Sequence, residues 1–350
     1  MPNDGSRLPG TSKPRRVSAL DVARLAGVSR SAVSRTYTPG AVVAAQTRAR
    51  VLRAAEALGY RPNLLARGLI TSRTGLIAIV LANLNSPFFS EFVSRLTVEL
   101  RGRTLRTLLL VTQPDQPTDE ALREALDYSI DGAILISARP SPEVAHAYSQ
   151  AGVPIVLLDQ RDADIAPDIA MVWTDGRIGV DVARIMRRDG RRRPVAMIGA
   201  GRAPGDEFLA FAEEMRAAGA EPCRWREVAL DYQAAHDTAD TLFADPATRP
   251  DAIFAATDLM AIGALDAARL AHGLSVPRDL SLVGIGNTPA AAWRSQRLSS
   301  VRLPIAGLVH HAVAVLIDRI NTPDAAAPRI WLECVIEERG TTNPGVERDA

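Results

Sequence analysis

The chain has 350 residues, of which 47% are hydrophobic, and its 41 basic and 40 acidic residues leave a net charge of +1. This length predicts a small domain plus a larger body of one or two lobes. No stretch of about 18 apolar residues occurs, which excludes a membrane-spanning helix from the prediction. Residues 1–10 lack the apolar core of a signal peptide. With two cysteines, Cys223 and Cys334, a disulfide framework is not expected, and these features indicate a cytoplasmic protein.

The charge is divided unevenly along the chain. Residues 1–74 contain 13 basic and 3 acidic residues, a net charge of +10. Residues 75–350 therefore contain 28 basic and 37 acidic residues, a net charge of −9. Such asymmetry indicates one segment that binds a polyanion. The basic segment lacks the Trp- and Phe-rich amphipathic face of a membrane-surface helix. Nucleic acid is the predicted partner, and no membrane partner is expected.

Residues 18–37 predict a helix, a sharp turn and a second helix. Gly27 stands where the chain must turn through a left-handed conformation, and Ser29 is a good N-cap for the second helix. The predicted inner face of the first helix comprises Leu20, Val22, Ala23 and Ala26, and that of the second comprises Ala32, Val33 and Thr36.

Three polar residues of the second helix, Arg30, Ser31 and Arg35, are then expected to point outward. A recognition helix contacts base edges in the major groove with residues at this position. The alternative is an ordinary pair of surface helices, because helix-turn-helix matches also occur by accident.

A third helix is predicted from Ala45 to Leu58, with an apolar stripe formed by Val51, Leu52, Ala55 and Leu58. Residues 60–69 predict a helix too short to be stable alone, which could fold on DNA, or else a plain linker. The predicted organisation is a disordered tail at 1–16, a helix-turn-helix domain at 17–60, a hinge helix and linker at 61–74, and a body at 75–341.

The body alternates short apolar runs with helical segments. The expected strands are residues 76–81, 107–111, 133–136, 155–158, 195–198, 252–255 and 282–285. The expected helices lie near residues 88–101, 119–128, 142–151, 176–189, 205–218, 233–244 and 258–271. This alternation predicts βαβ units and a parallel sheet. We therefore expect an all-α head and an α/β body of two doubly wound lobes, with a ligand cleft at the carboxyl ends of the strands.

Together these features resemble the lactose-repressor (LacI/GalR) family of bacterial transcription factors. The resemblance runs from about Val17 to Arg339. It rests on motifs whose order and spacing also fit. These motifs are Asp21-Val-Ala…Ala26-Gly-Val-Ser29, Val33-Ser-Arg35, Leu58-Gly-Tyr-Arg-Pro-Asn63, Leu65-Ala-Arg67, Asn85-Ser-Pro-Phe-Phe89, Asp131-Gly-Ala-Ile-Leu135, Asp251-Ala-Ile-Phe254, Asp258-Leu-Met-Ala-Ile-Gly-Ala264 and Val276-Pro277.

The resemblance implies a homodimer on a pseudo-palindromic operator in double-stranded DNA. It implies recognition helices in adjacent major grooves and a hinge helix in the minor groove, where Leu69 would wedge between base pairs and bend the DNA. Repression is the expected mode of regulation. The DNA-binding residues implied in this way are Ser29, Arg30, Ser31, Ser34, Arg35, Asn63, Arg67 and Leu69.

The resemblance also implies a body like a periplasmic binding protein, with three crossovers between the lobes. The expected first lobe is residues 75–173 plus 303–328, and the second is 174–302 plus 329–341. The implied effector-cleft residues are Phe88, Asp159, Asp175, Glu207, Tyr232, Asp258 and Asn287. The alternatives for two of them are structural, since Phe88 could lie in the core and Asp175 could cap the helix at 176–189.

Two positions depart from the family pattern. Glu207 stands where the family usually has an arginine, and Gly286-Asn287 replaces a pair of aspartates. A carboxylate cannot donate the hydrogen bonds of a guanidinium. With Asp159, Asp175 and Asp258 nearby, the predicted pocket is acidic and lacks a cationic partner. Any effector is therefore expected to be cationic or rich in hydrogen-bond donors, and a regulator without an effector is the main alternative.

An NAD-dependent oxidoreductase is the remote alternative. Gly199-Ala-Gly201-Arg-Ala-Pro-Gly205 is similar to a dinucleotide-binding fingerprint, but its last glycine is one residue late and Pro204 takes its place. The five histidines lack metal-ligand spacing, and no Gly-x-Ser-x-Gly elbow occurs. No catalytic residue, cofactor or metal is expected.

Overall fold

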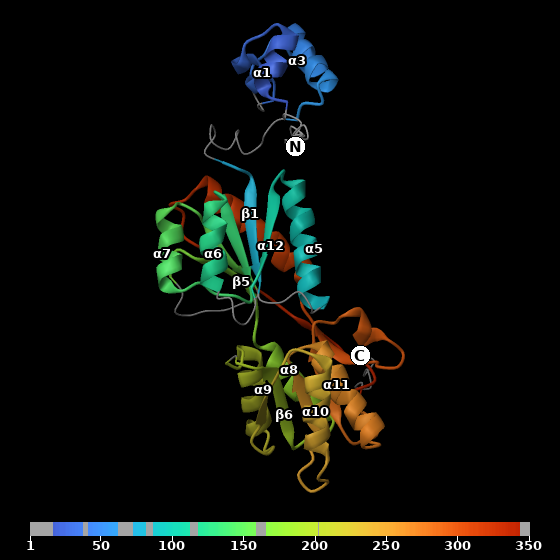
Figure 1. Ribbon diagram of the computed structural model, residues 1–350. Coiled ribbons are helices and arrows are strands. Elements are labelled where there is room, and N and C mark those ends of the chain that lie inside the picture. The colour runs from blue at the N-terminus through green and yellow to red at the C-terminus, as the bar shows by residue number, and fades with distance from the viewer. Residues whose placement is uncertain are drawn as a thin grey trace, which may run out of the picture. The chain divides into compact units, whose positions relative to one another are not determined.

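The computed structural model describes residues 17–37, 41–61, 73–81, 87–112, 118–158, 166–201 and 203–343, without the side chains of residues 87 and 88. The chain divides into two compact units, residues 1–74 and 75–350 (Figure 1). No helix in the ranges given above is both long and apolar enough to cross a membrane.

The first unit contains a small helical domain, which we call the head. Its helices are α1 (Ala19–Ala26), α2 (Arg30–Thr36) and α3 (Ala45–Ala57). They surround a core of small apolar side chains. That core comprises Val22, Ala23, Ala26, Val33, Val51, Ala54 and Ala55.

Two predicted core positions of the head are wrong. Leu20 is 44% exposed and Leu52 is 46% exposed. Helical periodicity explains the second error, because Ala54 and not Leu52 lies three residues from Val51 on the inner face. Leu20 lies in the first turn of α1, where the facing helices leave it half uncovered.

The first lobe of the body is a parallel sheet with helices on both faces. Its sheet has the strand order β11-β5-β4-β3-β1-β2. The strands are β1 (Leu76–Leu81), β2 (Arg106–Val111), β3 (Gly132–Ile136), β4 (Ile155–Leu158), β5 (Ala170–Thr174) and β11 (Arg329–Leu332). The helices are α5 (Pro87–Gly102), α6 (Thr118–Asp127), α7 (Pro142–Gln150) and α12 (Ile305–Asn321).

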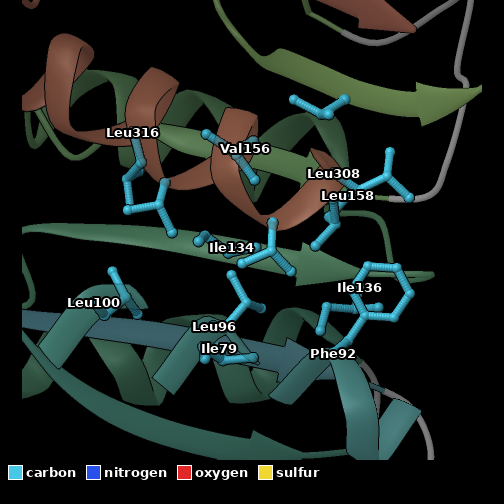
Figure 2. Close-up of a cluster of buried hydrophobic side chains, with 14 of the residues drawn as sticks. Ile79, Phe92, Leu96, Leu100, Ile134, Ile136, Val156, Leu158, Leu308 and Leu316 are labelled. Atoms are coloured by element: carbon cyan, nitrogen blue, oxygen red, sulfur yellow. The ribbon is translucent and has the colours of Figure 1, made fainter. Parts of the chain in front are cut away.

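Both faces of this sheet are buried. Figure 2 shows one face, where Phe92, Leu96 and Leu100 of α5 pack on the strands with Leu308 and Leu316 of α12. Helices α6 and α7 cover the opposite face (Figure 1). Burial on two faces explains why the strands read as continuous apolar runs rather than alternating ones.

The second lobe repeats the arrangement. Its sheet has the order β12-β10-β9-β8-β6-β7, and every pair is parallel except β10–β12. The strands are β6 (Pro194–Gly199), β7 (Arg224–Val228), β8 (Ala252–Ala255), β9 (Ser281–Ile285), β10 (Ser299–Arg302) and β12 (Val335–Glu337). Helices α8 (Ile178–Arg188) and α9 (Asp206–Ala217) cover one face, and α10 (Tyr232–Phe243), α11 (Asp258–Asp266) and the π-helix η1 (Ala267–Ala271) cover the other. A short 3-10 helix, η2 (Pro289–Ala292), follows β9.

The chain crosses between the lobes after β5, after β10 and after β11. The third crossover differs from the prediction, which put residues 329–341 in the second lobe. Arg329–Leu332 instead pairs with β5 in the first sheet, and the chain crosses at Glu333 and Cys334. The prediction also omitted β5, β7, β10, β11 and β12 from the strands and α12 from the helices.

Candidate nucleic-acid interface and effector site

The turn between α1 and α2 has the predicted conformation. Gly27 adopts a left-handed conformation at φ 63°, and the N–H of Val28 donates to the Ala23 carbonyl at 3.0 Å. Ser29 caps α2, because its hydroxyl oxygen accepts from the N–H of Ala32 at 3.2 Å. Both predictions are confirmed, and together these residues fix the direction in which α2 leaves the turn.

One face of α2 is polar and exposed. Val33 and Thr36 are buried in the head, whereas Arg30, Ser31, Ser34 and Arg35 are exposed. The exposed set is the one that the sequence predicts to contact DNA. A helix with this division can pack on its own domain and still present donors to base edges.

Ser29 has a structural role as well as its predicted DNA contact. Its hydroxyl caps α2 and also lies 2.8 Å from the Ser31 hydroxyl. The two serines therefore order the first turn of α2. The free main-chain N–H groups at the N-terminus of a helix attract phosphate.

The surroundings of α2 are strongly cationic. The described part of the head contains seven arginines, against Asp21 and Glu56. Arg48, Arg50 and Arg53 are exposed on α3. This charge favours a polyanionic partner and predicts salt-sensitive binding.

Several predicted site residues lie outside the described residues. Asn63, Arg67 and Leu69 of the predicted hinge are among them, as is Asp159. Phe88 lies in the first turn of α5, and its side chain is not among those that the structure describes.

Four predicted effector residues lie at one edge of the second lobe. Glu207, Tyr232, Asp258 and Asn287 follow β6, β7, β8 and β9, four parallel strands that end at the same edge. The carboxyl edge of a parallel sheet is the usual ligand site of such folds.

Asp258 is 1% exposed and is bonded within the lobe. Its Oδ2 accepts from the N–H of Thr288 at 2.6 Å and from the Thr288 hydroxyl at 2.9 Å. Its Oδ1 accepts from the Ser300 hydroxyl. Burial raises the pKa of the Asp258 carboxyl, while the bonds from Ser300 and Thr288 and the charge of Arg339 offset part of that rise. Asp258 thus joins α11 to the turn after β9.

Asn287 and Tyr232 are also bonded within the lobe. Asn287 adopts a positive φ of 48°, and its Oδ1 accepts from the Arg339 guanidinium at 2.6 Å. The Tyr232 hydroxyl donates to Asp266 at 3.0 Å. Asp266 lies eight residues beyond Asp258 on α11, about 12 Å along the helix axis. The Tyr232 hydroxyl is therefore directed away from Asp258.

Glu207 lies in the first turn of α9, whose N-cap, Gly205, has no side chain to offer. A Cβ added to Gly205 would lie 2.4 Å from Glu207 Oε1, so the carboxyl group occupies the space over the N-cap. Burial raises the pKa of this carboxyl group, and a hydrogen bond from its own main chain offsets part of the rise. Glu207 thus substitutes for the missing cap.

Asp175 lies in a groove at the crossover from β5 to α8. Its carboxylate accepts from the N–H of Arg177 at 2.9 Å and also pairs with the Arg177 guanidinium, which lies 5.3 Å from the centre of the Trp331 ring. Asp175 precedes α8, whose N-cap is Arg177, so it is not the N-cap itself. The groove has a volume of about 550 Å³ and is lined by Trp173, Asp175, Gly176, Arg177, Val180, Asp206, Ala210 and Trp331.

The prediction of one acidic pocket without a cationic partner is therefore wrong in two respects. Asp175 lies in the groove, whereas Asp258 is buried beneath Thr288 and Ser300. Arg177 pairs with Asp175, and the charge of Arg339 acts on Asp258.

The sequence reasoning also missed the two tryptophans of the groove. Trp331 and Trp173 are register partners on neighbouring parallel strands, and Trp331 is 49% exposed. The available signal was a tryptophan close in sequence to charged residues, as in Trp173-Thr-Asp175 and Trp331-Leu-Glu333. An aromatic side chain beside charged groups is a common feature of ligand sites.

Two family models match this chain. One, described as bacterial regulatory proteins of the lacI family, matches residues 19–63. The other, described as a periplasmic binding protein-like domain, matches residues 188–342. The first match spans the three helices of the head. The second begins at the end of α8 and spans the strands of the second lobe together with α12 and β11 of the first lobe.

Curated relatives align along nearly the whole chain. The regulator CelR of Thermobifida fusca is 30% identical over 331 residues, which cover 91% of this chain and 96% of CelR. The ribose operon repressor of Escherichia coli strain K12 is 29% identical over 333 residues, covering 92% and 98%.

Solved structures share the fold. The lac repressor dimer bound to operator and an anti-inducer matches with a TM-score of 0.83 at 21% identity, covering 93% of this chain and 99% of that one. The complex of CelR with cellobiose matches with a TM-score of 0.65 at 28% identity, covering 93% and 100%.

A helix-turn-helix head and a two-lobed periplasmic-binding-protein-like body together define a DNA-binding transcriptional regulator. The chain belongs to the lacI family of bacterial regulatory proteins.

Proposed function

We propose that this protein is a repressor that binds a pseudo-palindromic operator as a homodimer. The observation that carries the proposal is the exposed face of α2, where Arg30 and Arg35 stand beside Ser31 and Ser34 above a buried Val33. The +10 charge of residues 1–74 supports it, because phosphate contacts dominate the affinity of DNA-binding proteins. Within this proposal the protein acts in the cytoplasm and is not an enzyme.

Alanine variants of the two arginines test the readout. Arg30→Ala and Arg35→Ala should each reduce the preference for operator over random DNA by about 1–3 kcal/mol, the value of a bidentate contact to a base. Arg53→Ala on α3 is the control and should weaken binding to operator and to random DNA by the same factor. Equal losses on operator and random DNA for all three variants would contradict the assignment.

The salt dependence tests the dimer. Two heads that each neutralise several phosphates should give a slope of log K against log salt of roughly −6 to −10. Fluorescence anisotropy on a full operator and on a half-site measures it. A shallow slope, or equal affinity for both DNAs, would oppose dimeric binding.

The effector is, in this proposal, uncharged or cationic and rich in hydrogen-bond donors. Two features of the groove support this chemistry: Asp175 and Asp206 line it, and Trp173 and Trp331 supply a flat apolar surface. Carboxylates accept hydrogen bonds from donors and repel anions. Cellobiose, the ligand in the solved CelR complex, has this donor-rich character.

Screening the full chain tests the effector. Thermal shifts would be measured with neutral sugars, sugar phosphates, purines and polyamines, and each hit tested for release of operator. Trp331→Ala should weaken the binding of a groove ligand. Trp293→Ala, which removes an exposed tryptophan that does not line the groove, should leave that binding unchanged. Tight binding of an anionic sugar that Tyr232→Ala abolishes would refute this chemistry. A screen without any hit would favour a regulator that has no effector.

A further inference from the structure

An arginine-rich segment joins α8 to β6, and operator binding does not account for it. The run is Arg187-Arg188-Asp189-Gly190-Arg191-Arg192-Arg193, within a unit whose net charge is −9. Arg191 is buried and donates to Ser281 Oγ at 2.9 Å, and Arg193 donates to the Ala247 carbonyl at 3.2 Å. These two arginines therefore have structural roles.

The remaining arginines line a concave pocket, here called the arginine pocket. Its volume is about 410 Å³, and its lining residues are Arg184, Arg187, Arg188, Arg192 and Ala218. No carboxylate is among them. The pocket lies at the carboxyl ends of α8 and α9, about 15 Å along α8 from the groove at Asp175.

The neighbouring carboxylates hold the guanidinium groups from outside the pocket. Arg184 pairs with Asp181 at 2.9 Å, and Arg187 pairs with Glu214 at 2.7 Å. Arg188 pairs with Glu338 at 2.7 Å. Arg188 also donates to Asp189 and to the Asn343 carbonyl, so these bonds use most of its donors and fix its side chain. A guanidinium has five donors, and the pairs of Arg184 and Arg187 each use one at Nη1, which leaves further donors for a ligand.

Arg192, in the segment before β6, also lines the pocket. Its Nη1 donates to the carbonyl of Ala218, the C-cap of α9, at 2.6 Å. The carboxyl end of a helix attracts a cation, so this contact fixes Arg192 while its other donors stay exposed.

The spacing selects the kind of anion. Arg187 and Arg188 each lie about one helical turn from Arg184, with about 5–6 Å between such Cβ atoms. One phosphate group cannot pair bidentately with all of these arginines and with Arg192. Two or three linked phosphates can offer each guanidinium its own oxygens. We propose that the arginine pocket binds a small ligand with a di- or triphosphate group.

Isothermal titration of the full chain tests this site. The probes are inorganic tripolyphosphate, pyrophosphate, phosphate, sulfate and ATP, all at the same ionic strength. Arg184→Gln and Arg192→Gln should each weaken tripolyphosphate binding about tenfold, because one charge-assisted contact is lost. Arg216→Gln removes an arginine that is 65% exposed on α9 and pairs with Glu213, so it is the matched control and should bind normally.

The basic head also attracts oligophosphate, so the difference between wild type and variants measures the pocket. If ATP binds as tightly as tripolyphosphate, the ligand is the triphosphate group of a nucleotide. If ATP binds more weakly, the ligand is free inorganic oligophosphate. Unchanged binding in the Arg184→Gln/Arg192→Gln double variant would overturn the proposal. An equal loss in Arg216→Gln, or sulfate binding as tight as tripolyphosphate binding, would do the same. Thermal melting confirms that each variant is folded.

Discussion

Asp258 and Thr288 are joined by two hydrogen bonds, from the main-chain N–H at 2.6 Å and from the hydroxyl at 2.9 Å, to one carboxylate oxygen. The other oxygen accepts from Ser300 on β10. Three segments of the second lobe therefore meet at a single side chain that is 1% exposed. A buried carboxylate with three donors is a structural centre, and its place at the carboxyl edge of the sheet orders the turn beside the predicted effector site.

Removing the Asp258 carboxylate should destabilise the body. Asp258→Ala leaves the N–H and hydroxyl of Thr288 and the Ser300 hydroxyl without their acceptor, and we expect the free energy of unfolding to fall by about 3 kcal/mol. Asp258→Asn should lose less, because an amide oxygen can still accept from Thr288. Urea unfolding measures both, with Asp237→Ala, an exposed aspartate on α10, as control. An Asp258→Ala variant as stable as this control would contradict the structural role.

Gly179 allows α8 and α9 to approach each other closely. A Cβ at this position would lie 1.8 Å from the main-chain oxygen of Glu207, so Gly179→Ala should cost about 3 kcal/mol or more through overpacking. Gly102, at the end of α5, is the matched control, since no atom lies within 4 Å of its added Cβ. Gly102→Ala should change stability by less than about 1 kcal/mol. Thermal unfolding compares the two, and equal melting temperatures would refute the close approach.

Local signals in the sequence were sufficient for the head and for most strands. Gly27 and Ser29 act on residues next to them, so their roles follow from short-range geometry. Strands such as Leu76–Leu81 read as apolar runs because both of their faces are buried.

Long-range contacts decided what the sequence could not predict. Asp258 reads as a candidate ligand, yet its partners Thr288 and Ser300 lie 30 and 42 residues away. Helix α12 is apolar over much of its surface and has no side-chain cap, so neither periodicity nor capping marked it. The placement of β11 in the first sheet depends on its pairing with β5, a contact between distant segments.

Variants of the two serine caps of the head can distinguish a role in folding from a role in DNA contact. Ser18 forms a capping box with Asp21, and Ser29 caps α2. Ser18→Ala and Ser29→Ala should each destabilise the head by about 1 kcal/mol, seen as faster hydrogen exchange of the α1 and α2 amides in the full chain. Ser29→Ala should lose more operator affinity than Ser18→Ala, because only Ser29 belongs to the proposed DNA-contacting face. Equal affinity losses would assign Ser29 a capping role alone.

Glu207 should make the stability of the body depend on pH in a direction opposite to that of a glutamate paired with an arginine. Burial raises the pKa of Glu207 above the usual 4.5, so the folded protein binds this proton more tightly than the unfolded chain does. The stabilisation is then complete below the unfolded pKa and is lost as the pH rises through the folded pKa. Relative to Glu207→Gln, which cannot ionise, wild type should become less stable as the pH rises over that interval. Glu213 on the same helix is the control: the hydrogen bond from Arg216 lowers its pKa, so wild type should gain stability relative to Glu213→Gln as the pH rises from strongly acidic values. Urea unfolding at a series of pH values measures both differences. A difference in the free energy of unfolding between wild type and Glu207→Gln that stays constant with pH would show that the carboxyl group is solvated. Glu207 would then not act as the cap of α9.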